Sequence, residues 1–195
     1  MSGRPAVIYL IGFPGAGKLT IATEMSRQTD GRLVVIDNHL VNNPILAVVR
    51  ADGRSPLPAG VWEATAEVRR VVLRAIRELA APETSFVFTN VLIAGHPWDE
   101  RAISQIAAIA EARSSVFVPV LVDCQTEELA RRVTDPRRRE RLKMSDADRL
   151  REMVATSSLV TTDHPNTLKL DVTNLTPEVA GARILDHATS VGALV

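Results

Sequence analysis

The residues with the clearest chemical meaning lie near the start of the chain, where Gly12 and Gly17 enclose four residues and Lys18 follows at once. This Gly-x-x-x-x-Gly-Lys spacing stands between an apolar run at 6–11 and a segment with helical character at 18–29. Glycines let the backbone N–H groups of a loop wrap closely around an anion, and the positive end of the next helix points the same way. Lys18 adds a charge for the outer phosphates. We therefore expect a site for nucleotide phosphates; a glycine-rich turn with a surface lysine is the alternative.

We assign phosphate binding to the whole loop and to the first turn after it. The residues concerned are Gly12, Pro14, Gly15, Ala16, Gly17, Lys18, Leu19 and Thr20. The hydroxyl that usually follows the lysine and helps to hold Mg²⁺ is here replaced by Leu19, and Thr20 carries a hydroxyl one position later. Thr20 can contact a phosphate and is a candidate metal ligand. Since Mg²⁺ also accepts waters and nucleotide oxygens, weaker metal binding by the protein is the alternative.

The loop resembles that of adenylate kinases and other nucleoside monophosphate kinases, which also place a threonine one residue late. Later segments are similar to small-molecule kinases of the same superfamily: shikimate and gluconate kinases and the phosphotransferase that modifies chloramphenicol. In those proteins an aspartate ends the second strand, an arginine-rich lid follows the fourth, and Leu-x-Leu-Asp-x-Thr leads to a Pro-Glu helix. The corresponding segments here are Asp37, 137–143 and 168–178. The Asp-x-x-Pro-x-x-Arg segment typical of adenylate kinases is not apparent after 85–92, which argues against an adenylate kinase.

Strand and helix patterns alternate along the chain. Strands are predicted at 6–11, 33–36, 85–92, 116–122 and 168–170, and helices at 18–29, 40–50, 61–80, 98–113, from about 126, after an N-cap at Ser145, and from Pro177. Five strands joined by right-handed crossovers predict an α/β fold, a three-layer αβα sandwich around a five-stranded parallel sheet. The resemblance implies a P-loop NTPase of the nucleoside-kinase type. We expect one domain over 1–195, with a lid insert at 134–146.

Polar residues follow the second and third predicted strands. Ligands of open parallel sheets bind beyond the carboxyl ends of the strands, where Asp37, Asn38, His39 and Asn90 should lie. By resemblance, Asp37 is the candidate catalytic base for an acceptor hydroxyl; a helix N-cap is the alternative. Asn38, His39 and Asn90 are candidate substrate ligands, although His39 could equally pack on its helix and Asn90 could be a turn residue.

A run of basic residues at 137–143 falls where the resemblance places a lid. Lid arginines of such kinases stabilise the charge of the transferring phosphoryl group and exclude water. Arg138 and Arg141 are our candidates for this catalytic role, with Arg137 close behind. A solvated helix face is the alternative, which the interspersed Glu140 supports.

Three further positions are assigned to the nucleotide and its metal. By resemblance alone, Thr173 and Pro177 are expected to lie behind the adenine. Asp123 ends the fourth predicted strand and is a candidate for ordering water on the metal, with a helix cap as the alternative. Together with the loop, these residues predict ATP and Mg²⁺ as cofactors.

The composition limits the partners. The chain has 23 basic and 23 acidic residues, so it has no overall electrostatic bias toward nucleic acid or a membrane. The basic run lacks the stacking aromatics of a nucleic-acid platform. The apolar run at 6–11 is too short for a signal peptide or a membrane span, and the single cysteine, Cys124, suits a reducing compartment. We expect a cytoplasmic monomer or homodimer whose partners are a nucleotide and a small-molecule acceptor.

These features together predict an enzyme, an ATP-dependent phosphotransferase that moves the γ-phosphoryl group to a hydroxyl of a small molecule. Two alternatives stay open: a nucleoside monophosphate kinase, and a nucleotide-binding regulatory module or ATPase with little kinase activity. Release of ADP that depends on an acceptor distinguishes a kinase from the module.

Overall fold

The computed structural model describes residues 3–53, 55–136, 138 and 143–194. The strands are β1 (Arg4–Ile11), β2 (Leu33–Asp37), β3 (Ser85–Asn90), β4 (Val116–Asp123), β5 (Leu168–Asp171) and β6 (Ala193–Leu194). The helices are α1 (Lys18–Gln28), α2 (Asn38–Val48), α3 (Val61–Glu78), α4 (Pro97–Ala112), α5 (Thr126–Val133), α7 (Ala147–Thr156) and α8 (Pro177–Ser190). Within these described ranges, no helix combines the length and the apolarity that crossing a bilayer requires.

The strands form one parallel sheet in the order β2-β3-β1-β4-β5. The predicted α/β class and the five parallel strands are therefore confirmed. A sixth strand, β6, was not predicted: its two residues pair with Arg4 and Pro5 at the start of β1. Two residues are too few to show a strand period, so this pairing depends on contacts that only the folded chain makes.

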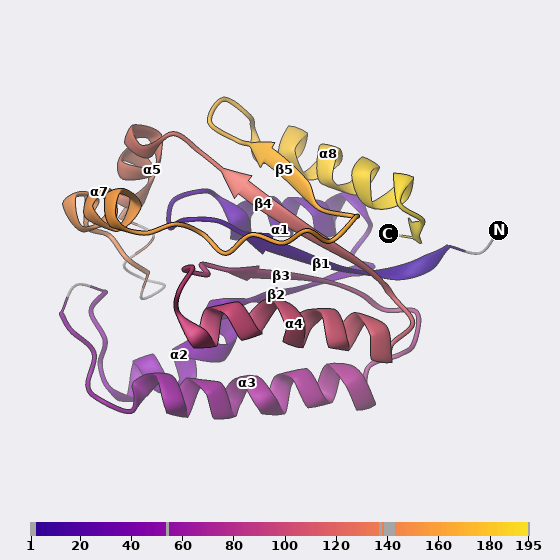
Figure 1. Ribbon diagram of the computed structural model, residues 1–195, viewed down its shortest axis with the longest axis horizontal. Coiled ribbons are helices and arrows are strands. Elements are labelled where there is room, and N and C mark those ends of the chain that lie inside the picture. Colours follow the sequence, from indigo (N-terminus) through magenta and orange to yellow (C-terminus); the bar gives the residue numbers. More distant parts are fainter. Residues whose placement is uncertain (1–2, 54, 137, 139–142, 195) are drawn as a thin grey trace.

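The central strand β1 separates two apolar layers, because successive side chains of a strand point to opposite faces of a sheet. Ala6, Ile8 and Leu10 join one buried cluster, to which α1 and α8 contribute, and Val7, Tyr9 and Ile11 join the other, to which α3 and α4 contribute. Figure 1 shows the resulting sandwich, with α8 and α1 on one side of the sheet and α3 and α4 on the other. This confirms the predicted three-layer arrangement.

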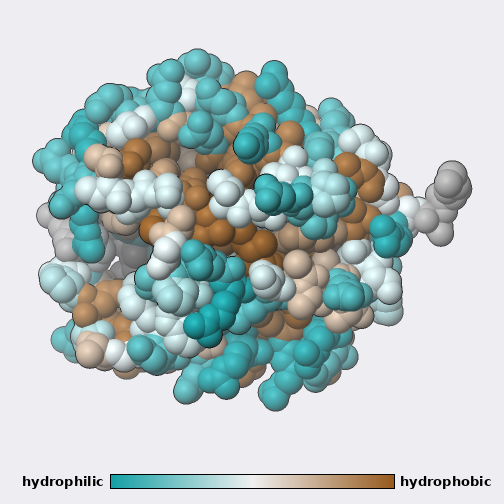
Figure 2. Space-filling view, in the orientation of Figure 1, coloured by the Kyte–Doolittle hydropathy of each residue, from teal (hydrophilic) through white to brown (hydrophobic). Residues whose placement is uncertain are grey.

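The parallel strands bring several loops to one edge of the sheet. In Figure 1 the strands run from right to left, so their carboxyl ends face the side where α5 and α7 lie. Figure 2 shows that the surface is hollowed on this side. The loop after β1 and the starts of α1 and α2 are thus placed near one another, as expected for the ligand side of such a sheet.

The start of α7 differs from the prediction by one residue. Ser145 was expected to cap this helix, but the cap is Asp146, whose carboxylate accepts hydrogen bonds from the backbone N–H groups of Asp148 and Arg149. Ser145 is buried instead. Both residues are good N-caps, and burial of the serine leaves the half-buried aspartate to take the role.

Candidate functional site

The glycine loop connects the end of β1 to the start of α1 with its backbone turned toward a potential ligand. Gly15 and Gly17 have φ angles of 89° and 82°, which glycine adopts without strain. Gly17 is the N-cap of α1 and has no side chain to accept from the N–H groups of the first turn. A phosphate at this position would supply the missing acceptor, since the amino end of a helix favours anions.

Two glycines of the loop are fixed by close backbone packing. A Cβ atom on Gly12 would lie 2.6 Å from the carbonyl oxygen of Val122, in β4. A Cβ atom on Gly15 would lie 2.7 Å from the carbonyl oxygen of Leu129, in α5. The loop therefore rests directly on the backbone of its neighbours, and any side chain at these positions would displace it.

Lys18 lies at the centre of a group of charges. Its Nζ donates hydrogen bonds to the carbonyl oxygens of Gly12 and Phe13, at 2.6 and 2.9 Å. Burial and then the neighbouring cations Lys143 and Arg138 lower the pKa of Lys18 to about 7, against the opposing effect of Asp37. Among the described residues, two cations and one carboxylate thus act on Lys18, a local excess of positive charge that the oxygens of a phosphate would offset.

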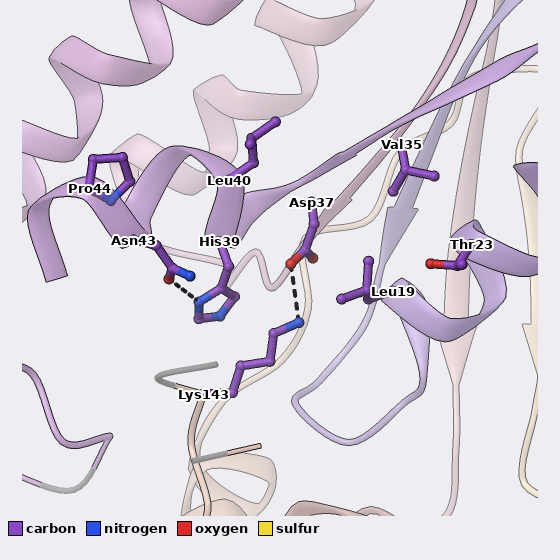
Figure 3. A pocket seen from close by; sticks show the side chains of 9 residues that line it. All are labelled: Leu19, Thr23, Val35, Asp37, His39, Leu40, Asn43, Pro44 and Lys143. Carbon is purple, nitrogen blue, oxygen red and sulfur yellow. Dashed lines mark hydrogen bonds and ion pairs between the residues drawn. The ribbon is translucent and has the colours of Figure 1, made fainter. Parts of the chain in front are cut away.

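Asp37 is held as a charged carboxylate between two donors. The Thr89 hydroxyl donates to Oδ1, and Lys143 Nζ lies 3.1 Å from Oδ2, as Figure 3 shows for the lysine. Burial raises the pKa of Asp37, but the Thr89 hydroxyl and the Lys143 charge outweigh it, so the net pKa lies below the ordinary value. Asp37 is the N-cap of α2 by position, yet its side chain makes no capping hydrogen bond. Its partners therefore favour a role in the site over a helix cap.

A cavity of about 700 Å³ opens beside the loop, on the Asp37 side. Its lining comes from α1, from β2 and α2, and from the last residue of the basic run: Leu19, Thr23, Val35, Asp37, His39, Leu40, Asn43, Pro44 and Lys143. His39 Nδ1 and Asn43 Oδ1 are 2.9 Å apart, and burial lowers the pKa of His39. Leu19, which we assigned to phosphate binding, thus contributes to a second compartment next to the phosphate loop.

The other candidate substrate ligands lie outside the lining of this cavity. Asn38 begins α2, half-buried. With its amide oxygen turned toward Arg69, Asn90 accepts from Nη2 at 3.1 Å and donates to the carbonyl oxygen of Thr89 at 2.8 Å. The structure therefore brings Asp37 and His39 together in one cavity and places Asn90 against α3. Thr89, one residue earlier, is the residue of β3 that contacts Asp37.

Two basic residues of the predicted lid are described near the loop. Arg138 Nε donates to the carbonyl oxygen of Met144 at 2.9 Å, and its charge lowers the pKa of Lys18. Arg137 and Arg141 lie outside the described residues. Lys143 was not among our candidates for a functional residue of the lid. One feature of the sequence could have indicated it: Lys143 precedes Met144, an apolar residue that ends the basic run and packs against the core.

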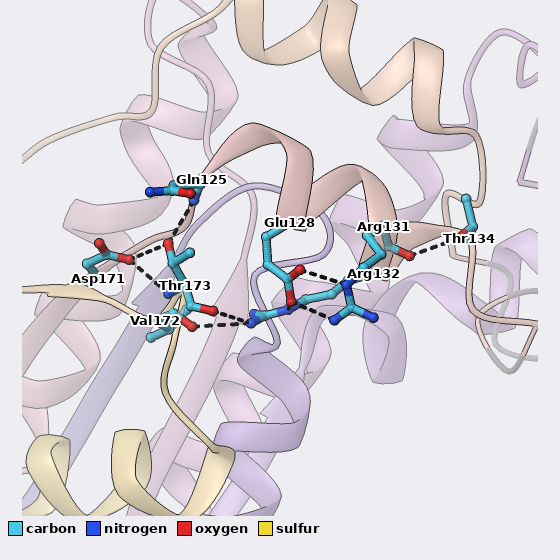
Figure 4. Close-up of polar contacts among 8 residues, drawn as sticks. All are labelled: Gln125, Glu128, Arg131, Arg132, Thr134, Asp171, Val172 and Thr173. Atoms are coloured by element: carbon cyan, nitrogen blue, oxygen red, sulfur yellow. Dashed lines mark hydrogen bonds and ion pairs between the residues drawn. The ribbon is translucent and has the colours of Figure 1, made fainter.

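The segment predicted to lie behind the adenine is fixed to α5 (Figure 4). Arg132 Nη2 donates to the carbonyl oxygens of Val172 and Thr173, at 3.3 and 3.0 Å, and its Nε pairs with Glu128 at 2.6 Å. The Thr173 hydroxyl accepts from the backbone N–H of Gln125 at 2.9 Å. Pro177 follows as the first residue of α8. The arrangement places Thr173 close to α5, and its contact with a base stays a prediction.

The residues present fit Mg²⁺ only as part of a metal–nucleotide complex. No group of three or more His, Cys, Asp or Glu side chains suited to a metal occurs in the described part of the chain. Asp37 is the one acidic residue in the described lining of the cavity. Asp123 Oδ1 accepts from the backbone N–H of Cys124 at 2.9 Å, and the cap of α5 is Gln125, so Asp123 does not cap that helix. One carboxylate with phosphate oxygens and waters is a usual Mg²⁺ environment.

Comparison with solved structures gives the fold. Over 98% of this chain and 95% of the other, the structure matches a gluconokinase from Sinorhizobium meliloti 1021 at a TM-score of 0.61 and 16% identity. It matches the Mycobacterium tuberculosis APS kinase, solved in complex with AMPPNP and APS, over 96% of this chain and 99% of that chain, at a TM-score of 0.60 and 15% identity. A sugar kinase from Janibacter sp. HTCC2649 matches at 0.56 and 20% identity, over 98% and 99% of the two chains.

The chain has the fold of the P-loop kinases. The match extends over almost the full length of each compared chain, and it agrees with the resemblance found in the sequence. No protein-family model matches the chain, and no curated protein matches its sequence. At identities this low, the likeness establishes the architecture, and the chemistry has to be argued from the site itself.

Proposed function

We propose that this protein is an ATP-dependent kinase that transfers the γ-phosphoryl group to a hydroxyl of a small molecule. The observation that carries the proposal is the position of Asp37. Its carboxylate is held by Thr89 and Lys143 and lines a cavity that adjoins the phosphate loop, with Leu19 shared between the two. A phosphate site and an acceptor-sized cavity that meet at a fixed carboxylate are the parts that phosphoryl transfer needs.

The residues of the loop and of the segments around it each have a separate task in this proposal. The loop amides and Lys18 bind the β- and γ-phosphates, and Thr20 contacts a phosphate from the first turn of α1. Mg²⁺, bound with the nucleotide, would neutralise phosphate charge, with Asp37 and Asp123 as the carboxylates of the chain that could orient its waters. Thr173 and Pro177 lie behind the adenine, and Arg138 and Arg141 of the lid at 134–146 stabilise the charge of the transferring group.

The reaction itself is a single displacement. The acceptor oxygen attacks the γ-phosphorus, a new O–P bond forms, and the bond between the γ-phosphorus and the bridging oxygen breaks, so ADP leaves with the electron pair. The acceptor proton goes to Asp37 and then to solvent. Because the pKa of Asp37 is lowered, its carboxylate first orients the hydroxyl and accepts the proton late, when the bond to phosphorus has made that oxygen more acidic.

The solved neighbours support the proposal at a coarse level. They are a sugar kinase, a gluconokinase and an APS kinase, and the structure of the APS kinase contains AMPPNP and APS. The same fold also occurs in a thymidylate kinase from Candida albicans, at a TM-score of 0.60 and 14% identity, so the fold alone does not select the acceptor.

The direct test is release of ADP from Mg-ATP in the presence of a panel of acceptors: nucleoside monophosphates, shikimate, gluconate and hydroxylated antibiotics. We expect one class to raise the rate well above the rate without acceptor. With that acceptor, Asp37→Asn should lower the rate by about 10²- to 10⁴-fold while ATP binding is kept. The matched control is Asp186→Asn, which alters an exposed carboxylate on α8. An unchanged rate in Asp37→Asn would remove this residue from the mechanism, and ATP binding without any stimulated turnover would favour a nucleotide-binding module.

A further inference from the structure

We call the cavity beside Asp37 the acceptor cavity. The charged side chains that line it already pair with one another. Among the described lining residues, the charged groups are Asp37 and Lys143, whose atoms lie 3.1 Å apart. Their side chains are only 13% and 14% exposed, so water screens the pair weakly. His39 contacts Asn43, and burial lowers its pKa, so it adds little positive charge near neutral pH.

An acceptor that carries its own anionic group would fit this lining poorly. Its carboxylate or phosphate would compete with Asp37 for Lys143 and would lie close to a like charge. The other two described cations of the site have partners of their own: Lys18 donates to the loop carbonyls, and Arg138 donates to the Met144 carbonyl and interacts with the charges of Asp135 and Asp37. The described charges of the cavity wall are therefore paired with one another, which favours a ligand body without charge.

The remaining lining is largely apolar and continues onto the surface. Leu19, Val35, Leu40 and Pro44 line the cavity. Leu40, Pro44 and Val48 follow one another at intervals of four residues, which places them along one side of α2. Leu40 is 56% exposed and Val48 is 81% exposed. An apolar strip thus leads from the cavity along the helix, away from Asp37.

From this lining we infer that the acceptor is an uncharged amphiphilic alcohol, with its hydroxyl at Asp37 and its apolar body along Leu40, Pro44 and Val48. The inference rests on the proposed kinase function for the role of the hydroxyl, but the binding site for the apolar body can be tested separately. Each methylene group that becomes buried along the strip should strengthen binding about fourfold.

The binding site is tested with the neutral fluorescent probe N-phenyl-1-naphthylamine. We expect the probe to bind the wild-type protein and to bind Leu40→Lys about tenfold more weakly, because the lysine places a charge in the apolar wall. The matched control is Leu79→Lys: this residue is the C-cap of α3, is 82% exposed and does not line the cavity, so its substitution should leave probe binding within twofold. Equal affinity in the wild type and in Leu40→Lys would overturn the inference, provided that circular dichroism shows both to be folded.

The preference for an uncharged ligand is tested by displacement of the probe. We compare 3-phenylpropane-1,2-diol with phenyllactate, which has the same ring and a carboxylate in place of the terminal hydroxymethyl group. The diol should displace the probe at a concentration at least about tenfold lower than phenyllactate. Equal displacement, or better displacement by the carboxylate, would overturn the inference.

The length of the strip is tested with alkane-1,2-diols from hexane to decane, in a variant that cannot disturb the core. Val48 is almost fully exposed, so Val48→Lys should keep the fold. We expect affinity to rise along the series in the wild type, and the rise to stop at the longer diols in Val48→Lys. Parallel series in the two proteins would show that the strip is not used.

Measurement of ADP release with the same compounds separates this inference from the proposed kinase function. Stimulation only by gluconate or nucleoside monophosphates would overturn the amphiphile inference and leave the kinase standing. If no compound stimulates ADP release, while probe binding depends on Leu40 and the diol is preferred, the kinase proposal fails and the apolar ligand site stands.

Discussion

The phosphate loop and the acceptor cavity lie side by side and are built in opposite ways. The loop offers mainly backbone N–H groups of one short segment, and its shape follows from glycines that press on β4 and α5. The cavity offers side chains from segments far apart in the sequence: Asp37 meets Thr89 across 52 residues and Lys143 across 106 residues. A backbone site can be identified from consecutive residues, whereas a side-chain site exists only once the sheet has formed.

This difference predicts that substitutions in the two regions impair different properties of the protein. Changes in the loop should remove nucleotide binding whatever acceptor is present. Changes around Asp37 should leave ATP bound and alter either the rate or the choice of acceptor. The following measurements test this separation, beginning with the largest expected effect.

Lys18→Met should weaken ATP binding by about 10²- to 10³-fold, because the lysine is the mobile cation at the phosphates and the loop amides alone remain. Isothermal titration calorimetry measures the affinity. The control is Lys169→Met, which removes an exposed lysine from β5 and should bind ATP like the wild type. If Lys18→Met kept its ATP affinity, the loop would not be the phosphate site.

Lys143→Met should lower the rate at neutral pH by about ten- to a hundredfold and leave ATP binding within a few-fold. The Lys143 charge lowers the pKa of Asp37, so its loss should raise that pKa. Asp37 acts when ionised, and its activity is lost as the pH falls through its pKa. The acid limb of the rate profile should therefore move to higher pH in the variant. A limb that stays in place would separate Lys143 from Asp37 and make the ion pair structural only.

Binding of ATP should depend on pH through Lys18. Its pKa is lowered to about 7 without a ligand, and the phosphates should raise it. Above pH 7 the protein must then take up a proton when ATP binds, and the affinity should fall with rising pH, by up to about tenfold per unit. Calorimetry in buffers with different ionisation enthalpies counts these protons. The uptake should vanish in Lys18→Met, and an affinity that is constant from pH 7 to 9 would contradict the link.

Arg132→Ala should have the smallest effect: a loss of about 1–2 kcal/mol in the free energy of unfolding and a modest loss of ATP affinity. Arg132 joins α5 to the carbonyl oxygens of Val172 and Thr173, which the variant leaves without this donor. Arg131→Ala is a matched control, because Arg131 pairs with the same Glu128 but is exposed, and such pairs contribute little. Urea unfolding with and without ATP measures both effects. Equal stability of the two variants would show that the link from α5 to Thr173 is unimportant.

Most of the architecture could be predicted from local patterns. The apolar runs of β1 and β4 and the periodic helices between the strands identified the layers, because burial on both faces leaves a pattern along the chain. The prediction differs from the structure where a strand is too short to show a period, and where burial in the folded chain determines which residue caps a helix. Strand β6 has two residues, and the cap of α7 moved from Ser145 to Asp146 because the serine is buried.

The site could be predicted only as far as it is local. The phosphate loop needs no distant residue to be recognised. For Asp37, by contrast, the sequence left a catalytic role and a helix cap both open, and the contacts with Thr89 and Lys143 favour the first. Leu19 was assigned to the nucleotide by its place after Lys18, and its contribution to the acceptor cavity depends on how α1 faces β2.

The glycine packing of the loop also bears on how such a scaffold can evolve. The atoms that crowd Gly12 and Gly15 are the carbonyl oxygens of Val122 and Leu129, and every amino acid carries that oxygen. No second mutation can therefore make room for a side chain at either glycine. Neither glycine should tolerate substitution, even together with a compensating mutation elsewhere. The cavity wall has no such restriction, since Leu40, Pro44 and His39 line it with side chains and not with backbone atoms. Under the proposed kinase function, a lineage with this fold can thus change its acceptor step by step while its nucleotide site stays the same.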